Sequence, residues 1–373
     1  MMLRKFLLLI FLGLFFGCSL STQNVGVKEN ELKEIPLKYA VHLKIYSTDC
    51  GDYFVKIRNP WDTLKTLHSY FITDNDTSIA GVSVLKRPIE KSLIFTSLHA
   101  SLIKNLGCVD KISSLCDVQY VLDKDLLERV EDGKIKDLGS SMTPDAERII
   151  LENPDVILLS PYESSNGFGV LSKTKIPLVE CADYMENSPL GQAEWIKFYG
   201  IIFDKVGTAD SIFRVVENNY LQLKQLVENS STKPILLANS LTGSVWYMPT
   251  IKSTSGRFYC DAGFSYPFDN LEGFGTVPLD FEAVFSKASN AEKWIFKYNR
   301  NEDYTLETFS KEHANYKDFN AMQKGEVYGC NLQVVPFYDQ TPFRPDLLLK
   351  DYIKISHPEI LKDYKMRYFK KLE

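Results

Sequence analysis

Apolar residues recur every three or four positions through the middle of the chain, and this pattern divides the chain in two. They stand at positions 195, 198, 202, 206, 209, 213, 216, 220, 223 and 227. One face of an α-helix requires this spacing. Gly207 and Thr208 interrupt the composition of this segment. A glycine at the end of one helix, followed by a threonine that caps the next, is typical of a break between two helices. The pattern predicts two helices in near-continuation, the second over residues 209–228.

The segments on either side of these helices have similar patterns. Glu147 lies near the start of a predicted helix at 144–153, and the apolar run 156–159 follows as a buried parallel strand. Glu282 likewise lies near the start of a predicted helix, ahead of the apolar run 293–296. We therefore expect an α/β protein with two Rossmann-like lobes. Its parts are an N-terminal lobe over 39–192, connecting helices over 193–231 and a C-terminal lobe over 232–373.

The N-terminal lobe begins with strand-like runs at 39–46, 53–57 and 92–96, with a turn at 59–62. Residues 39–91 therefore form a β-rich part whose role the sequence leaves open.

The first residues are typical of an export signal. Arg4 and Lys5 precede an apolar run over 6–16, which is too short to span a bilayer and ends at Gly17 and Cys18. This arrangement resembles the lipobox of a bacterial lipoprotein. It predicts a signal peptide over 1–17, lipidation at Cys18, a tether over 18–38 and a body held to the envelope membrane. The alternative is an ordinary signal peptide with an incidental cysteine.

Charge and motifs exclude several classes of function. The chain has 43 Lys and Arg against 48 Asp and Glu. It therefore has a net charge of −5 and lacks the excess of positive charge that is typical of proteins that bind nucleic acid. No motif of a nucleophilic, nucleotide-binding or zinc-dependent enzyme is present. The six cysteines after Cys18 lack zinc-site spacing, and disulfides and buried thiols both remain open. We expect neither catalysis nor a bare metal site.

Aromatic residues are numerous, with 23 Phe, 20 Tyr and 4 Trp. They can fill a core or line a pocket for a large, flat ligand.

A series of motifs in a fixed order covers residues 92–365. They lie at 95–99, 105–107, 147–158, 175–179, 193–200, 261–263, 278–282, 325–328 and 357–359. With them the chain resembles the solute-binding lipoproteins of ATP-driven importers for iron complexes, haem and cobalamin. The resemblance implies a ligand cleft between two lobes joined by a rigid helix. It also implies a monomer in the bacterial cell envelope, on the periplasmic side, that works with an ABC permease and its ATPase.

Ligands of α/β lobes bind beyond the carboxyl ends of the strands. The loops expected there carry the candidate ligand-binding residues, which are His99, Tyr162, Glu163, Tyr184, Met185, Trp246, Tyr247, Tyr298, Tyr338, Phe343 and Arg344. Among them, Arg344 is expected to meet a carboxylate and Trp246 to project from a polar loop. His99 is a candidate axial ligand to iron.

In the resembled family, one surface glutamate on each lobe docks onto the permease. Glu147 and Glu282 match those two positions. Two alternatives remain open, a capture protein that works with an outer-membrane receptor and a chelatase-like enzyme of the same two-lobe architecture. The sequence does not choose among an iron siderophore, haem and cobalamin.

Overall fold

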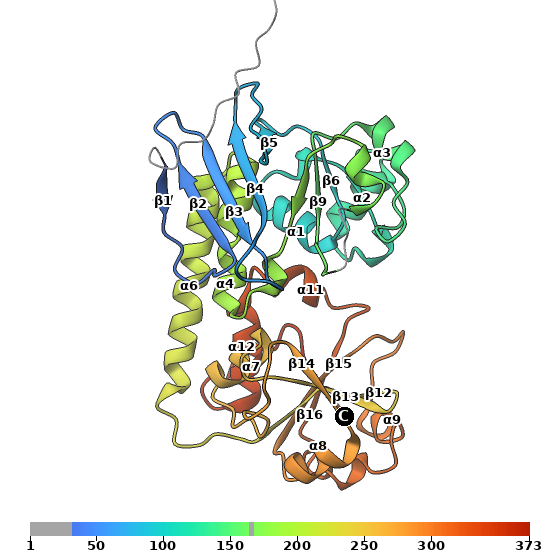
Figure 1. Cartoon of the computed structure of the whole chain (residues 1–373). Coiled ribbons are helices and arrows are strands. Elements are labelled where there is room, and N and C mark those ends of the chain that lie inside the picture. Colours follow the sequence, from blue (N-terminus) through green and yellow to red (C-terminus); the bar gives the residue numbers. More distant parts are fainter. Residues whose placement is uncertain (1–31, 164–167) are drawn as a thin grey trace, which may run out of the picture.

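The computed structural model describes residues 32–163 and 168–373, and they form two α/β lobes (Figure 1). This confirms the predicted fold class. The predicted signal peptide, Cys18 and the tether up to residue 31 lie outside the described residues.

The first lobe contains a parallel sheet in the order β10-β9-β6-β7-β8. Its strands are β6 (Ser92–Ile94), β7 (Ile112–Leu115), β8 (Lys136–Asp137), β9 (Val156–Leu159) and β10 (Leu178–Glu180). Its helices are α1 (Ser97–Asn105), α2 (Lys124–Glu131) and α3 (Ala146–Glu152). All four residues of β9 are buried, as a central strand covered on both faces requires.

A second sheet, here called the N-terminal sheet, packs beside the first lobe (Figure 1). Its strands follow in sequence order as β1 (Lys33–Ile35), β2 (Leu43–Ser47), β3 (Tyr53–Arg58), β4 (Thr66–Thr73) and β5 (Ser83–Lys86). The first four are antiparallel, and β5 runs parallel to β4. Alternate residues of β2, Leu43 and Ile45, are buried in the first-lobe core.

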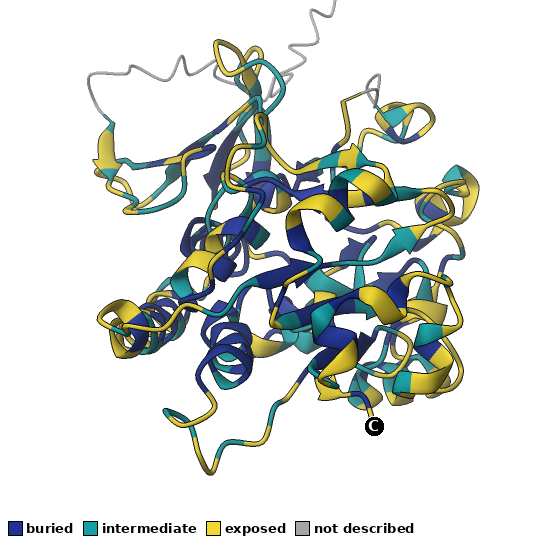
Figure 2. Ribbon diagram, turned by 90° about the horizontal axis from the view of Figure 1, so that it is seen from below, coloured by how far each residue is buried: buried dark blue, intermediate teal, exposed yellow. Residues whose placement is uncertain are grey.

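The second lobe has two smaller sheets. One has the order β11-β15-β16-β17 and the other β12-β13-β14. The strands are β11 (Leu236–Ala238), β12 (Leu241–Thr242), β13 (Val245–Pro249), β14 (Thr276–Leu279), β15 (Lys293–Tyr298), β16 (Val327–Asn331) and β17 (Lys370–Lys371). The helices are α7 (Thr254–Asp261), α8 (Phe281–Ala288), α9 (Leu306–Ser310), α10 (Asn320–Gln323), α11 (Phe337–Gln340) and α12 (Pro345–Ser356). In Figure 2 the strands are largely buried, while exposed residues lie on the outer faces of helices and on loops.

Three helices join the lobes, α4 (Pro189–Glu194), α5 (Ile196–Ile202) and α6 (Val206–Glu228). Two successive helices are confirmed, but α6 packs against α5 instead of continuing it, and the predicted break at Gly207 and Thr208 is wrong. The chain turns earlier, at Asp204, whose φ of 53° is left-handed. Gly207 lies inside the first turn of α6, where the helix tolerates a glycine without ending.

Helix α6 contributes to both cores. Phe213 and Val216 belong to the first-lobe core, and Tyr220 and Val227 belong to that of the second lobe. The helix therefore fixes the two lobes to one rigid element (Figure 1). Among the described residues, no helix is both long and apolar enough to cross a bilayer. All six cysteines of this part of the chain are free thiols.

Candidate functional site

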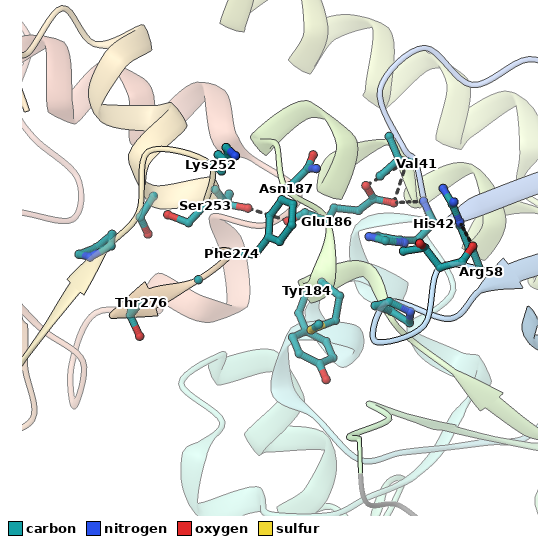
Figure 3. A pocket seen from close by; sticks show the side chains of 17 residues that line it. Val41, His42, Arg58, Tyr184, Glu186, Asn187, Lys252, Ser253, Phe274 and Thr276 are labelled. Carbon is teal, nitrogen blue, oxygen red and sulfur yellow. Dashed lines mark hydrogen bonds between the residues drawn. The ribbon is translucent and has the colours of Figure 1, made fainter. Parts of the chain in front are cut away.

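A cavity of about 590 Å³ lies where the N-terminal sheet, the first lobe and the second lobe meet. We call it the interlobe pocket (Figure 3). Its lining comes from three separate segments of the chain: residues 41–63 from the N-terminal sheet, 184–187 from the first lobe, and 249–276 from the second lobe. Its volume falls within the range of small-molecule sites.

Glu186 holds the N-terminal sheet at the pocket. Its buried carboxylate accepts hydrogen bonds from the backbone N–H groups of Val41 and His42, and from the indole N–H of Trp195 at 2.9 Å. The carboxylate thereby ties the entry of β2 to the joining helices. A buried carboxylate is stable there because these donors replace its water.

His42 and Arg58 form the wall that the N-terminal sheet supplies (Figure 3). The backbone N–H of Arg58 donates to the carbonyl oxygen of His42 at 2.7 Å, so the two residues are fixed side by side. The side chain of His42 is only 9% exposed, and its Nδ1 has no hydrogen-bond partner among the described residues. Burial lowers the pKa of His42; the Glu186 carboxylate opposes this shift and the Arg58 guanidinium adds to it. The ring is therefore neutral at pH 7.

The second lobe closes the opposite wall with the turn before α7. Ser253 caps that helix by accepting the N–H of Gly256, and the hydroxyl of Thr254 donates to the carbonyl oxygen of Glu186 at 2.7 Å. A Cβ on Gly256 would lie 2.2 Å from the carbonyl oxygen of Thr250, so only glycine permits this tight turn. The turn presents Lys252 to the pocket.

Two aromatic side chains stand exposed in the pocket. Tyr184 is 42% exposed and Phe274 is 74% exposed. Phe274 lies between Gly273 and Gly275, whose φ values of 95° and 86° make a turn that holds the ring outward. In Figure 3 Phe274 lies between the His42 wall and the Lys252 wall, and Tyr184 lies below them. This arrangement can hold a flat or aromatic ligand by stacking.

The structure brings two of the predicted ligand residues, Tyr184 and Met185, into the interlobe pocket. Tyr162 instead lines a smaller cavity of about 380 Å³ at the carboxyl ends of β6 and β9. Glu163 lines a groove between the N-terminal sheet and β10. Tyr247 and Tyr338 are exposed on the second lobe and do not line the pocket.

Trp246 does not lie in a loop, contrary to the expectation. It is the second residue of β13 and fully buried, and its indole N–H donates to the carbonyl oxygen of Ala238 at 2.8 Å. Its ring stacks on Trp294 with centroids 5.7 Å apart. The polar sequence around Trp246 predicted a long loop. The structure has a tight hairpin turn there instead, made by Gly243 with a φ of 63°.

His99 is likewise not in a loop but in α1, where it is fully buried. Its Nε2 lies 3.1 Å from both the Asp183 carboxylate and the Tyr199 hydroxyl, and its Nδ1 lies 2.5 Å from the Thr96 hydroxyl. Burial disfavours the charged ring, but Cys181 and Asp183 outweigh it and raise the pKa of His99 to about 10. Both ring nitrogens are thus occupied by protein partners.

The remaining three candidates have protein partners of their own. The hydroxyl of Tyr298 donates to Asp303 at 3.0 Å. Phe343 is buried in the first-lobe core, edge-on to Tyr199. Arg344 pairs with Asp346 through two hydrogen bonds of 2.9 Å each.

Sequence reasoning predicted none of the other residues that line the pocket, among them His42, Arg58, Lys252 and Phe274. The first two lie in the β-rich part that the motifs do not cover. The Gly-Phe-Gly sequence at 273–275 was the available signal for Phe274, because an aromatic residue between two glycines is typical of an exposed turn. Within the described ranges, no three His, Cys, Asp or Glu side chains converge to hold a metal ion.

Glu147 and Glu282 have the same local structure. Each is exposed in the first turn of its helix, α3 or α8, two residues after an aspartate that caps the helix, Asp145 or Asp280. The positive end of each helix dipole favours these carboxylates. The two helices lie toward opposite ends of the molecule (Figure 1).

Comparison with known proteins gives the class to which this fold belongs. The family described as "Periplasmic binding protein" matches residues 105–333, well over half of the chain. The chain therefore belongs to the periplasmic binding protein family. The matched region begins after the N-terminal sheet.

Two similar proteins come from Methanocaldococcus jannaschii and Bacillus subtilis. An uncharacterized lipoprotein of Methanocaldococcus jannaschii is 27% identical over 384 residues, covering 94% of this chain and 88% of the relative. The petrobactin-binding protein YclQ of Bacillus subtilis is 27% identical over 159 residues, covering 42% of this chain and 48% of the relative.

Solved structures share the fold at low identity. Haem-complexed IsdE of S. aureus has a TM-score of 0.57 and 14% identity, covering 72% of this chain and all of that chain. The vitamin B12 binding protein BtuF of Vibrio cholerae has a TM-score of 0.54 and 11% identity, covering 74% and 99%. The two-lobe fold of solute-binding proteins is thus confirmed. Such proteins bind solutes without catalysing a reaction, and they work with the permease components of ABC transporters.

Proposed function

We propose that this protein is the solute-binding component of an ABC importer and that it captures a metal chelate in the interlobe pocket. The ligand class is an iron siderophore, haem or cobalamin. The observation that carries the proposal is the pair of exposed aromatic rings, Tyr184 and Phe274, in a cavity of about 590 Å³ between two lobes fixed by one helix. The names of YclQ, IsdE and BtuF support the same ligand class.

The protein then delivers its ligand to a permease. Glu147 and Glu282 are the proposed docking residues, one on each lobe. Lipidation at Cys18 would hold the protein to the envelope membrane, and the relative from M. jannaschii named as a lipoprotein supports this. Metabolic labelling with palmitate, compared between the natural chain and a Cys18→Ala variant, tests the anchor.

The ligand proposal is tested first by the visible absorption spectrum of the protein purified from its native host. Haem, corrins and ferric siderophores each give a distinct band. The purified protein is then titrated with haemin, cyanocobalamin, ferric enterobactin and ferrichrome. We expect at least one of these chelates to bind, and a colourless protein that binds none of the four contradicts the proposal.

Two double variants locate the site. Tyr184→Ala with Phe274→Ala removes both rings of the pocket, and we expect the affinity for the bound chelate to fall ~10–100-fold. The matched control is Tyr247→Ala with Tyr338→Ala, which removes two exposed rings outside the pocket. If the control pair weakens binding and the pocket pair does not, the ligand binds elsewhere.

A further inference from the structure

We propose that the N-terminal sheet gives the interlobe pocket an anion subsite, in which His42 and Arg58 on one wall and Lys252 on the other hold a carboxylate or phenolate oxygen of the ligand. This deepens the proposed function and rests on it, because it specifies which chelates the pocket selects. The subsite lies partly outside the matched family region, which begins at residue 105.

The first supporting observation is the unpartnered nitrogen of His42. Its Nδ1 is buried without a hydrogen bond to any described residue, although its ring lines the pocket. A buried nitrogen without a partner reduces stability, so a protein that keeps one has a use for it. A neutral imidazole can donate a hydrogen bond from Nδ1 to an anionic oxygen. Burial, which lowers the pKa of His42, favours that neutral form.

The second observation is the charge of the pocket. Of its described lining residues, Glu186 is the single carboxylate, and its oxygens already accept hydrogen bonds from Val41, His42 and Trp195. Lys252 and Arg58 are both exposed at the pocket. With the described residues, Arg58 makes one side-chain hydrogen bond, from Nε to the carbonyl oxygen of Thr63 at 2.6 Å, and neither cation forms an ion pair. Both terminal nitrogens of the Arg58 guanidinium thus remain for an oxyanion.

The third observation is that the two cationic walls belong to different parts of the fold. Arg58 is fixed through its backbone to His42 at the N-terminal sheet, and Lys252 belongs to the turn before α7 in the second lobe. Figure 3 shows them on opposite sides of Tyr184 and Phe274. An anionic group between them would interact favourably with both cations and join the lobes through the ligand.

The test compares matched probes that differ in anionic oxygens. Haemin is compared with haemin dimethyl ester, whose propionates are blocked, and anionic ferric enterobactin with neutral ferrichrome. We expect the natural protein to prefer the anionic member of at least one pair, and Arg58→Gln with Lys252→Gln to weaken that member ~10-fold or more. The neutral member should change less than ~2-fold. Arg214→Gln with Lys233→Gln, two exposed cations outside the pocket, is the matched control.

His42→Phe separates a role in binding from a role in folding. It fills the same space without the unpartnered nitrogen, so we expect the ligand-free protein to unfold at a higher temperature and the anionic probe to bind more weakly. A lower unfolding temperature with unchanged binding would mean that His42 is only structural, and would overturn its part in the subsite.

The outcomes distinguish the subsite from the proposed function. If a chelate binds but both members of each pair bind equally and Arg58→Gln with Lys252→Gln has no effect, the anion subsite is wrong and the chelate proposal stands. If no chelate binds, the proposed function fails, and citrate decides the subsite. Thermal stabilisation by citrate that is lost in the double variant supports an anion site, and equal or absent stabilisation overturns it.

Discussion

A single carboxylate, Glu326, fixes the edge of the second-lobe sheet. It precedes β16 and accepts hydrogen bonds from Lys293 on β15, from Lys371 on β17 at 2.6 Å, and from the hydroxyl of Tyr328 at 2.8 Å. Burial alone would raise its pKa, but the hydrogen bonds from Lys293 and Lys371 outweigh burial and lower the pKa to about 2. Glu326 belongs to a motif at 325–328 on which the sequence resemblance depends, and its role there is structural.

This pKa predicts how stability depends on pH. A carboxyl whose pKa falls from 4.5 to about 2 on folding stabilises the protein above pH 4.5 and loses that effect as the pH falls toward 2. Glu326→Gln should therefore reduce the free energy of unfolding by about 1–3 kcal/mol at pH 7, and the difference should shrink on acidification. Urea unfolding at pH 7 and at low pH measures it. Glu307→Gln, at an exposed site, is the control, and a difference that persists unchanged in acid contradicts the assignment.

At the scale of elements, the contact between α5 and α6 depends on one glycine. A Cβ on Gly200 would lie 2.5 Å from the Cβ of Ala209 and 3.1 Å from the carbonyl oxygen of Lys205. The left-handed turn at Asp204 brings α6 back against α5 at this point. The angle at which α6 leaves the first lobe therefore depends on the absence of a side chain at residue 200.

Two alanine substitutions with opposite expected effects test this contact. Gly200→Ala should reduce the free energy of unfolding by about 1–3 kcal/mol, because the overpacking exceeds the gain in helix propensity. Gly207→Ala, where a Cβ meets nothing within 4 Å and φ is not positive, should raise it by up to ~1 kcal/mol. Chemical unfolding of both variants provides the comparison. If Gly200→Ala is as stable as Gly207→Ala, the helices are not in close contact.

The elements show where local sequence information was sufficient. The strand β9 and the joining helices were predicted because their apolar patterns are long or uninterrupted. The break between α5 and α6 was misplaced because a left-handed aspartate has a weaker signature than a glycine. The hairpin at Gly243 was missed because β12 has only two residues, too few for a strand pattern.

At the scale of the whole molecule, the two lobes could be predicted but the pocket between them could not. Its walls come from three segments that are distant in sequence and share no periodicity, so no local pattern relates His42 to Lys252. Tyr184 and Met185 were found because they follow a strand of the first lobe. Three of the other predicted side chains, His99, Trp246 and Arg344, instead bind Asp183, Ala238 and Asp346 of the protein itself.

The proposed docking residues make a prediction at this scale. Glu147→Arg with Glu282→Arg should reduce uptake of the bound chelate, carrying radiolabelled iron or cobalt, by at least ~10-fold in cells, because both lobes lose their charge complement to the permease. Affinity for the chelate should change less than ~2-fold, since neither residue lines the pocket. Glu307→Arg, an exposed glutamate in the first turn of α9, is the control. Uptake that survives the double reversal contradicts the docking assignment and favours a capture protein that needs no permease.

The burial of Phe343 in the first lobe has a consequence for the order of folding. The chain passes from the first lobe to the second through the joining helices, so the strands and helices of the first lobe are all synthesised before those of the second. Domains fold as units, the N-terminal one first as the chain emerges. The first-lobe core nevertheless lacks one aromatic ring until residue 343 has been synthesised, after most strands and helices of the second lobe. A nascent chain that stops short of this residue leaves the space beside Tyr199 unfilled, and that lobe acquires its full stability only after residue 343 has been made.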